Sequence, residues 1–268
     1  MQVINNTPFP AIGWPSSDSQ ERQYITTLVR VKYRFDTLDE DGIWHLKFDP
    51  EQGELFNKDI FYDEKKRHVQ YESDFVPYKR QADLIVNLSP TRREYGQSGI
   101  EVVRYQSLES KKSLLKENTL KYFGFLHRSH DERMQWVGTL DKKWIETKAP
   151  VFPDDFNEKH YNAAHPKMQL FQSYFEPGDA ITLHKLLKGR HQQTVLIPGV
   201  YLQSTPKVGH EKAPVLLAVD TIIFDIEDLD IEKNSIYMSY RSRVEIEGKA
   251  ERVTIDMSLE EALIEKEA

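Results

Sequence analysis

The residues best suited to chemistry are two groups of histidines with aspartates nearby. One group is the segment HRSHD at 127–131, and the other comprises Asp154, Asp155, His160 and His165. A metal centre needs three or four ligands that converge on one point. The two histidines of the first group stand three positions apart, so they face opposite sides of a strand, and their surroundings are typical of a loop between strands. We therefore predict no metal site, and surface or capping roles for these side chains.

Aspartates offer a second kind of chemistry, because a glycosidase uses two carboxylates that stand roughly 5–10 Å apart. The candidates are Asp141, Asp154, Asp155 and Asp220. An aspartate beside Gly or Pro usually accepts hydrogen bonds from turn amides, which is a structural role. The chain also lacks the GxGxxG, GxxxxGK[ST], HExxH and GxSxG motifs of common cofactor, nucleotide, zinc and hydrolase sites. We predict no catalytic residue, no cofactor and no enzymatic activity.

The amino-acid composition of the chain limits the kinds of molecule that it is expected to bind. The 268 residues carry 36 Lys and Arg against 43 Asp and Glu, a formal net charge of −7, whereas nucleic-acid binders usually have a basic surplus. No cysteine is present, which excludes disulfides, thiolate zinc sites and iron–sulfur clusters. The start, MQVINNTPFP, lacks a secretion-signal pattern, and no stretch approaches the roughly 18 apolar residues of a membrane helix. We predict a cytoplasmic protein that binds no nucleic acid and inserts into no membrane.

Alternating residues predict the elements that must position any site. In LVRVKYRF at 28–35, the residues Val29, Val31, Tyr33 and Phe35 face one way, and Arg and Lys residues face the other. Asp41-Gly42 then supplies a tight turn into a second alternating run, IWHLKF at 43–48. The two runs predict a β-hairpin with one buried face.

Short strands with turn residues between them dominate the rest of the chain. Six further strands are predicted at 82–88, 100–105, 120–126, 193–202, 214–226 and 235–246. Their spacing favours a mainly β fold, either an antiparallel β-sandwich or an open barrel. Few helices are expected. One would begin at Asp154 or Asp155 and run towards Ala164, where Pro166 would stop it.

The C-terminal residues predict a short helical tail. Ser258 and Glu261 form a capping-box pattern ahead of the charged sequence SLEEALIEKEA. We therefore predict a single β-rich domain over residues 1–257 and a helical tail over 258–268.

The segment from Val137 to Asn157 contains an unusual density of turn residues. Gly138 permits a positive φ or a close approach of the backbone, and Asp141 can accept hydrogen bonds from turn amides. Trp144 is expected to be a large buried anchor, and Pro153 stiffens the path to the aspartates that follow. Such a segment is typical of a long loop held across a sheet.

The same residues carry a resemblance to a known family. GTLDKKW at 138–144, followed by PDDFNEKHYNAAHP at 153–166, resembles the paired signature of a bacterial family of uncharacterised domains encoded beside type VI secretion effectors. Other blocks agree in order, from about residue 5 to about residue 245: NTPF at 6–9, ESDFVPYKRQADLIV at 72–86, PGD at 177–179, LIPGVYL at 196–202, Asp220-Thr221 and Tyr240-Arg241. Many relatives carry a longer, Gly-rich region before the first signature, whereas only LHRSHDERMQ at 126–135 fills that place here.

The resemblance implies a non-enzymatic effector adaptor or chaperone. Such a protein would bind a cognate secreted toxin, often one with a PAAR-like domain, and help load it onto the VgrG spike protein. It supplies no catalytic centre, and the residues that match the family signature are expected to be structural: Asp74, Lys79, Asp83, Gly138, Thr139, Asp141, Trp144, Pro153, Asp155, Phe156, Asn162, Asp220, Thr221 and Arg241. The residues that contact the partner are not identified by the resemblance.

Two arrangements among these residues are expected. Asp74, Lys79 and Asp83 would form a local charge network around a turn, and Asp220 would pair with Arg241 across neighbouring strands.

Two other classes of function stay open. A carbohydrate-active β-sandwich enzyme or sugar-binding module would use Trp14, Trp136 or Trp144 as a stacking platform beside Asp154 or Asp155. It requires a concave site with exposed aromatic rings, whereas an adaptor requires a partly apolar groove or a free sheet edge. A scaffold subunit would self-associate and bind no specific toxin.

Overall fold

The computed structural model describes residues 1–18, 20–62, 65, 69–88, 99–105, 111–114, 128–147, 152–170, 173–186, 192–226 and 230–259. Strands account for most of the regular structure among these residues, which confirms the predicted mainly β class. The helical elements described are the α-helices α1 (His130–Met134) and α2 (Lys142–Thr147) and the short 3-10 helices η2 (Glu158–Tyr161), η3 (Pro166–Met168) and η4 (Ile231–Lys233).

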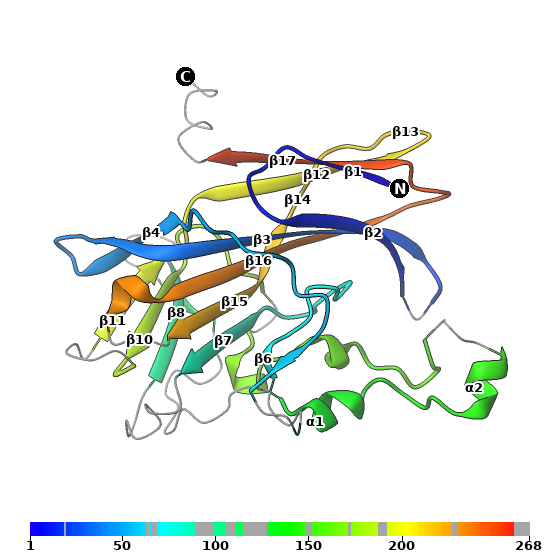
Figure 1. Ribbon diagram of the computed structural model, residues 1–268, viewed down its shortest axis with the longest axis horizontal. Helices are drawn as coiled ribbons and strands as arrows, with labels where there is room; N and C mark the ends of the chain where they lie inside the picture. The colour runs from blue at the N-terminus through cyan, green and yellow to red at the C-terminus, as the bar shows by residue number, and fades with distance from the viewer. Residues whose placement is uncertain are drawn as a thin grey trace.

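A large curled sheet forms a half-barrel (Figure 1). Its strands follow the order β7-β15-β16-β3-β4-β11-β10-β8-β9, and β2 pairs with β3 as well. Their bounds are β2 (Ala11–Ser17), β3 (Gln23–Leu38), β4 (Ile43–Phe48), β7 (Asp83–Leu88), β8 (Gly99–Tyr105), β9 (Lys111–Ser113), β10 (Ala180–His184), β11 (Gln192–Leu196), β15 (Ala218–Ile226) and β16 (Ser235–Glu245). A separate pair of short strands, β5 (Ile60–Phe61) and β6 (Val69–Tyr71), lies outside this sheet.

A second, smaller sheet lies above β2, β3 and β16 in the view of Figure 1. It follows the order β1-β17-β12-β13, with β14 also paired to β12. The bounds are β1 (Gln2–Asn5), β12 (Val200–Val208), β13 (His210–Glu211), β14 (Val215–Leu216) and β17 (Arg252–Leu259). The layers meet closely at Gly13, where a Cβ atom would lie 2.6 Å from Cγ1 of Val253. A residue without a side chain is therefore needed at this contact.

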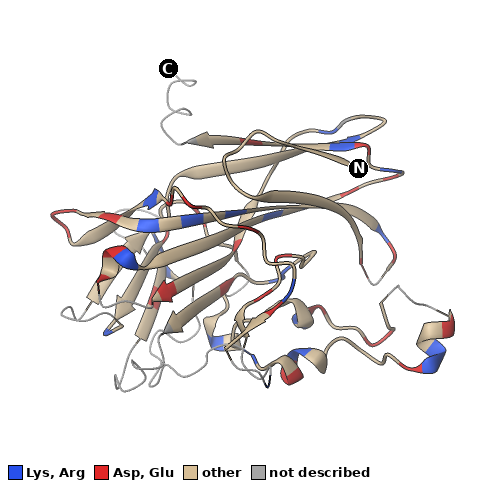
Figure 2. Ribbon diagram, viewed as in Figure 1, with Lys and Arg blue, Asp and Glu red and all other residues tan. Residues whose placement is uncertain are grey.

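The expected hairpin is present, as the antiparallel pair β3–β4. Val29, Val31, Tyr33 and Phe35 are all buried, as their alternation predicted, and Gly42 takes the positive φ of 80° that the turn requires. Lys and Arg residues recur along β3 (Figure 2), and they include Arg30, Lys32 and Arg34, which alternate with the inward-facing residues. The cationic side of β3 is covered only in part, because Arg30 is buried and bound to Asp74 whereas the Arg34 side chain is 39% exposed.

Three strand pairs in the two large sheets are parallel, although the sequence favoured an antiparallel arrangement. They are β1–β17, β4–β11 and β7–β15. Each brings together strands that are far apart in the sequence, so no tight turn between them was available as a signal. The fold is therefore a mixed sheet in which most pairs are antiparallel.

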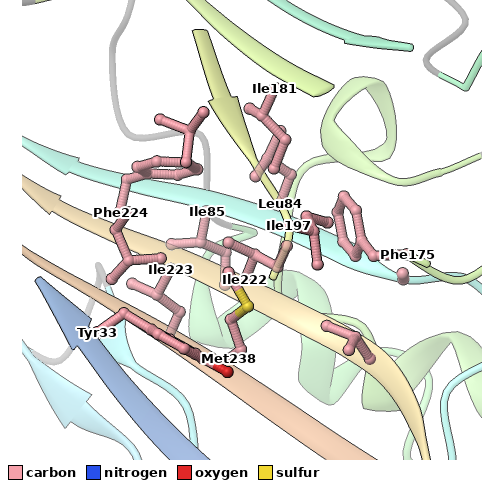
Figure 3. Packing of buried hydrophobic residues seen from close by; sticks show 14 of the residues in the cluster. Tyr33, Leu84, Ile85, Phe175, Ile181, Ile197, Ile222, Ile223, Phe224 and Met238 are labelled. Carbon is pink, nitrogen blue, oxygen red and sulfur yellow. The ribbon is translucent and has the colours of Figure 1, made fainter. Parts of the chain in front are cut away.

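The hydrophobic core fills the half-barrel (Figure 3). Leu84 and Ile85 of β7 meet Ile222, Ile223 and Phe224 of β15 there. Consecutive buried residues in β15 show that both of its faces are covered, as expected for a strand inside a sheet that has neighbours on both sides. Each fully buried aliphatic or aromatic side chain contributes about 1.5–3 kcal/mol to folding.

Several predicted boundaries differ from the structure. The strand expected at 193–202 is two strands, β11 and β12, because the chain passes from the large sheet to the small one at Pro198-Gly199. The strand expected at 120–126 lies outside the described residues. The prediction that a helix begins at Ser258 is wrong, because Ser258 pairs with Tyr201 within β17. The remainder of that expected tail, residues 260–268, is also outside the described part of the chain.

The helix expected from Asp154 or Asp155 to Ala164 is not formed. Asn157 has an extended backbone and caps only the single turn of η2. Further along, the Asn162 side chain and the Ala163 amide both bind Asp83 of β7, at 2.9 Å each. These contacts with another element stabilise an irregular backbone instead of the local helix.

None of the helices among the described residues is long and apolar enough to cross a membrane.

Candidate docking site

Lys79 stands at the centre of a buried ion network. Its side chain is 0% exposed, and its ammonium donates to Asp83 Oδ2 at 2.9 Å and to Thr221 Oγ1 at 2.7 Å. It also contacts Glu72 Oε1. Lys79 precedes β7, Asp83 begins β7, and Thr221 lies in β15. The side chain of Lys79 therefore links β7, β15 and the segment that precedes β7.

Asp220 extends this network to the next strand. The register of β15 and β16 shifts between Val219 and Thr221, so Asp220 is the extra residue of a β-bulge. Its carboxylate accepts from the Thr221 hydroxyl at 3.0 Å and contacts the guanidinium of Arg241 in β16. The predicted pairing of Asp220 with Arg241 is confirmed.

Arg241 and Arg30 connect Asp74 to the same network. Arg241 Nη2 donates to the Asp74 carbonyl at 3.3 Å, and Arg30 Nη1 binds the Asp74 carboxylate at 2.5 Å. The predicted charge network of Asp74, Lys79 and Asp83 is therefore present in part. Lys79 binds Asp83 directly, whereas the Asp74 carboxylate binds Arg30.

Electrostatics keep Lys79 charged. Burial opposes its charge, but the neighbouring carboxylates of Asp83, Glu72 and Asp220 outweigh that effect and raise the pKa of Lys79. Burial raises the pKa of Glu72 to about 7, against the opposing charge of Lys79. A lysine held as an ammonium has no lone pair for nucleophilic attack. The arrangement is suited to fixing the positions of three segments.

The other family-signature residues form a second cluster, at 138–156. Thr139 donates to the Asp155 carboxylate through its amide, at 2.8 Å, and through its hydroxyl, at 2.7 Å. Asp141 Oδ1 accepts from the amide of Trp144 at 2.8 Å, as its predicted turn role requires. Gly138 has φ +89°, and a Cβ atom there would lie 2.6 Å from Asp155 Oδ1.

Trp144 differs from the expected buried anchor. It is half-buried and lines a cavity of about 240 Å³ together with Asp141, Asp154 and Asp155. Pro153 is buried and Phe156 is half-buried, and the next buried ring is that of Tyr161, which follows the segment.

Aromatic contacts hold the end of the segment. Phe156 stacks on Phe152 with ring centroids 4.3 Å apart, and it tilts against Tyr161 at 5.3 Å. Asn162 then donates to the carbonyl of Gln81 at 2.7 Å as well as to Asp83. The second cluster is therefore attached to the ion network through Asn162.

The histidines have structural partners. His160 Nδ1 lies 2.8 Å from the carbonyl of Arg133, and His165 Nδ1 accepts from the amide of Lys167 at 3.2 Å. His130 begins α1 and packs edge-on against Phe61. His127 lies outside the described residues, and those that are described contain no group of three or more side chains placed to hold a metal.

Helix α1 was missed, because its segment was expected to be a loop. Ser129 and Glu132 cap it reciprocally, a pattern that was readable in the sequence. Next to it, Trp136 is stacked under the guanidinium of Arg128 at 4.3 Å. Trp14 packs against Phe75. Of the three proposed sugar platforms, Trp144 lies beside aspartates in a cavity.

Two further cavities adjoin each other along β14 and the start of β15. The first, of about 250 Å³, contains Lys79, Asp220, Arg241 and Arg243 in its lining, and we call it the arginine cavity. The second, of about 430 Å³, is mainly apolar and is called the apolar cavity. Both are lined by Tyr174, Leu216 and Ala218.

Leu216 is the most prominent side chain at this junction, and it is 63% exposed. The sequence did not identify Leu216, Tyr174 or Arg243 as site residues. Leu216 belongs to the apolar run at 214–219, which predicts a buried strand, whereas in the structure it lies in the two-residue strand β14 and is exposed. We call the two adjoining cavities together the docking groove, and Lys79, Asp220 and Arg241 of the ion network contribute to its lining.

The fold and these sites define a mainly β protein whose half-barrel sheet is joined to its surface segments by buried ion pairs. Residues 108–241, half of the 268-residue chain, match the model of a family described as an uncharacterized protein conserved in bacteria, DUF2169. The chain belongs to this family. The match ends at Arg241, while Asp74, Lys79 and Asp83 lie before it. No curated protein and no solved structure shows significant similarity to the chain.

Proposed function

We propose that this protein is a non-enzymatic adaptor that binds a toxin of a type VI secretion system in the bacterial cytoplasm. It keeps the toxin, often one with a PAAR-like domain, soluble and helps to load it onto the VgrG spike. The sequence resemblance supplies the secretion pathway, and membership in the bacterial family is consistent with it.

The observation that carries the proposal is the docking groove. Leu216 is 63% exposed where two cavities adjoin, and a partner seated in both cavities would cover it and remove its apolar surface from water. The apolar cavity, at about 430 Å³, is large enough to accept a bulky side chain of that partner. An adaptor needs such a groove and needs no reactive group.

The test is capture of the partner from the native bacterium. The tagged chain is expressed in cells that produce the secretion system, and retained proteins are identified by mass spectrometry. The expected result is recovery of a toxin together with spike components. Leu216→Asp should abolish this recovery, since it places a charge at the junction of the cavities.

Ile145→Asp is the matched control. Ile145 is 61% exposed on α2 and lies outside the lining of the groove. The control variant should retain the toxin as the wild-type chain does. Retention of neither toxin nor spike protein by a folded wild-type chain would refute the adaptor function. Self-association without a toxin would favour a scaffold subunit.

A second candidate function is supported by the cavity beside Trp144. This half-buried indole and three aspartates line one hollow, which is the combination that a sugar-binding module requires. Two of the aspartates already accept hydrogen bonds from neighbouring groups, so they are positioned as structural acceptors. Glycan-array binding that is lost in Trp144→Ala and kept in Leu216→Asp would support this function.

A further inference from the structure

We infer that the docking groove recognises an extended segment of the partner in which an Asp or Glu stands next to a large apolar residue. The carboxylate would enter the arginine cavity, and the apolar side chain would enter the apolar cavity. This inference rests on the proposed function and names the chemistry of the partner at that site.

The first observation is a cation in the lining of the arginine cavity that has no carboxylate partner among the described residues. Its lining includes Lys79, Arg241 and Arg243 but only one carboxylate, that of Asp220. Lys79 is balanced by Glu72 and Asp83, and Arg241 is paired with Asp220. Within the described part of the chain, no carboxylate forms an ion pair with Arg243. Arg243 is therefore a cation of this lining that a ligand carboxylate would neutralise.

The second observation is a pair of unsatisfied donors. The Nε atoms of Arg241 and Arg243 are both buried, and neither has a hydrogen-bond partner among the residues described. The Arg241 side chain is only 5% exposed. Buried donors without acceptors are uncommon in native proteins, and charged donors are the costliest to leave unpaired. Both Nε atoms are closed to solvent, so a ligand carboxylate would meet Arg243 through its terminal Nη groups.

Stacking keeps the guanidinium of Arg243 in place for such a ligand. Its central carbon lies 3.7 Å from the centroid of the Tyr24 ring and 5.4 Å from that of Tyr78. These contacts use the flat faces of the guanidinium, whereas its N–H groups point outwards in its plane. The rings therefore orient the cation and leave donors for an acceptor.

The apolar cavity determines the second residue of the proposed partner segment, the large apolar one. Phe175, Val200 and Leu217 contribute to its mainly apolar lining, and Leu216 stands between the two cavities. A carboxylate is favoured over a phosphate, because Asp220 also lines the arginine cavity and would repel a dianion more strongly. Adjacent acidic and apolar side chains on one extended segment would reach the two cavities together.

Labelled peptides test this inference directly. The probe is a ten-residue peptide with a central Glu-Phe pair, and its matched controls carry Gln-Phe or Glu-Ala. Fluorescence anisotropy with the full-length chain should show at least tenfold weaker binding of both control peptides. Arg243→Gln should weaken the Glu-Phe peptide at least tenfold and should leave the Gln-Phe peptide unchanged.

The variant control is Arg80→Gln. Arg80 is a surface cation whose side chain is 72% exposed and lies outside the lining of the groove, so its loss should not change peptide binding. Arg241→Gln is avoided, because Arg241 contributes to folding. Circular dichroism and thermal unfolding verify that Arg243→Gln is folded.

The outcomes separate this inference from the adaptor function. If the chain retains a toxin in cells but binds the Glu-Phe and Gln-Phe peptides equally, or binds neither, the inference is wrong and the adaptor function stands. If the chain discriminates the peptides but retains no toxin, the chemistry of the groove stands and the adaptor function is refuted.

Discussion

Asp220, the extra residue of the bulge in β15, contacts Arg241 on the neighbouring strand and is thereby buried with it. A bulge is needed at this point because regular alternation would send one of two consecutive residues to the opposite face of the sheet. Asp220 and Thr221 instead both join the same polar network. The irregular pairing of β15 with β16 at the bulge and the ion pair between Asp220 and Arg241 therefore depend on each other.

Removing the cation of this pair should strongly destabilise the fold. Arg241→Ala leaves the carboxylate of Asp220 buried without its partner, and such losses cost about 3–5 kcal/mol. Urea unfolding monitored by circular dichroism measures the change. Arg80→Ala, which removes a cation that is 72% exposed, should change the free energy of unfolding by less than about 0.5 kcal/mol. Unchanged stability of Arg241→Ala would show that the pair does not contribute to folding.

The Glu72 carboxyl should make stability fall as pH rises. Its pKa is raised from 4.5 to about 7 in the folded chain, so the folded chain binds this proton more tightly than the unfolded chain does. Between these two values its contribution becomes unfavourable, by up to about 3 kcal/mol. Glu72→Gln removes that loss. The free energy of unfolding of the variant should therefore rise relative to wild type between about pH 4 and about pH 8.

A carboxyl with the opposite shift provides the control for this pH series. Glu251 is exposed, and its hydrogen bond from Lys207 lowers its pKa. Its contribution is therefore favourable above the unfolded pKa and is lost on acidification. Glu251→Gln should show no gain relative to wild type as pH rises. Parallel curves for Glu72→Gln and wild type would exclude a raised Glu72 pKa.

Close packing of the two sheets should make Gly13 intolerant of a side chain. In Gly13→Ala the new Cβ would meet Cγ1 of Val253, a stiff and fully buried side chain, so a cost of about 1–3 kcal/mol is expected. Val253→Ala removes the conflicting methyl group. In that background the additional cost of Gly13→Ala should fall below about 0.5 kcal/mol, which a double-mutant cycle measures. If the free-energy costs of Gly13→Ala and Val253→Ala were additive, the side chains at these two positions would not be in steric conflict.

Two aspartates of the 138–156 segment should protect different amides from hydrogen exchange. Asp155 accepts from the amide of Thr139, and Asp141 accepts from that of Trp144. Asp155→Ala should speed exchange at Thr139, and Asp141→Ala should speed exchange at Trp144, each with little effect on the other site. Because both groups are exposed, each variant should lose at most about 1 kcal/mol of global stability. Equal acceleration at both amides in either variant would indicate a single cooperative unit.

The buried side of β3 was predictable from the sequence, and its partners were not. Alternation placed Val29 and Val31 inward correctly, because the period of two is a local property of a strand. Arg30 was expected to face solvent, but it binds Asp74, which is 44 residues away. Lys79 likewise bonds to Thr221 over a separation of 142 residues. A local pattern carries no information about such partners.

Helices were the least predictable elements, because their boundaries depend on contacts with other segments. Asp155 was expected to cap a helix, but its carboxylate binds Thr139. In the docking groove, the sequence did not identify Leu216 or Arg243 as site residues. The sequence pattern of a strand is the same whether one of its residues is exposed at the mouth of a cavity or buried in the core. The Asp220–Arg241 pair was predicted because two short blocks of the family signature each supplied one partner.

The parallel pairing of β1 with β17 also constrains how the chain is made in the cell. Gln2 pairs with Arg252, so β1 has no strand partner until β17 has left the ribosome. At about 5–20 residues per second, that wait lasts on the order of 10–50 s. During synthesis the apolar residues Val3 and Ile4 stay exposed, as does one edge of β12, whose neighbour is also β17. The pairing of the first strand therefore waits for the synthesis of β17, and chaperones that act on nascent chains have a defined interval in which to bind this protein.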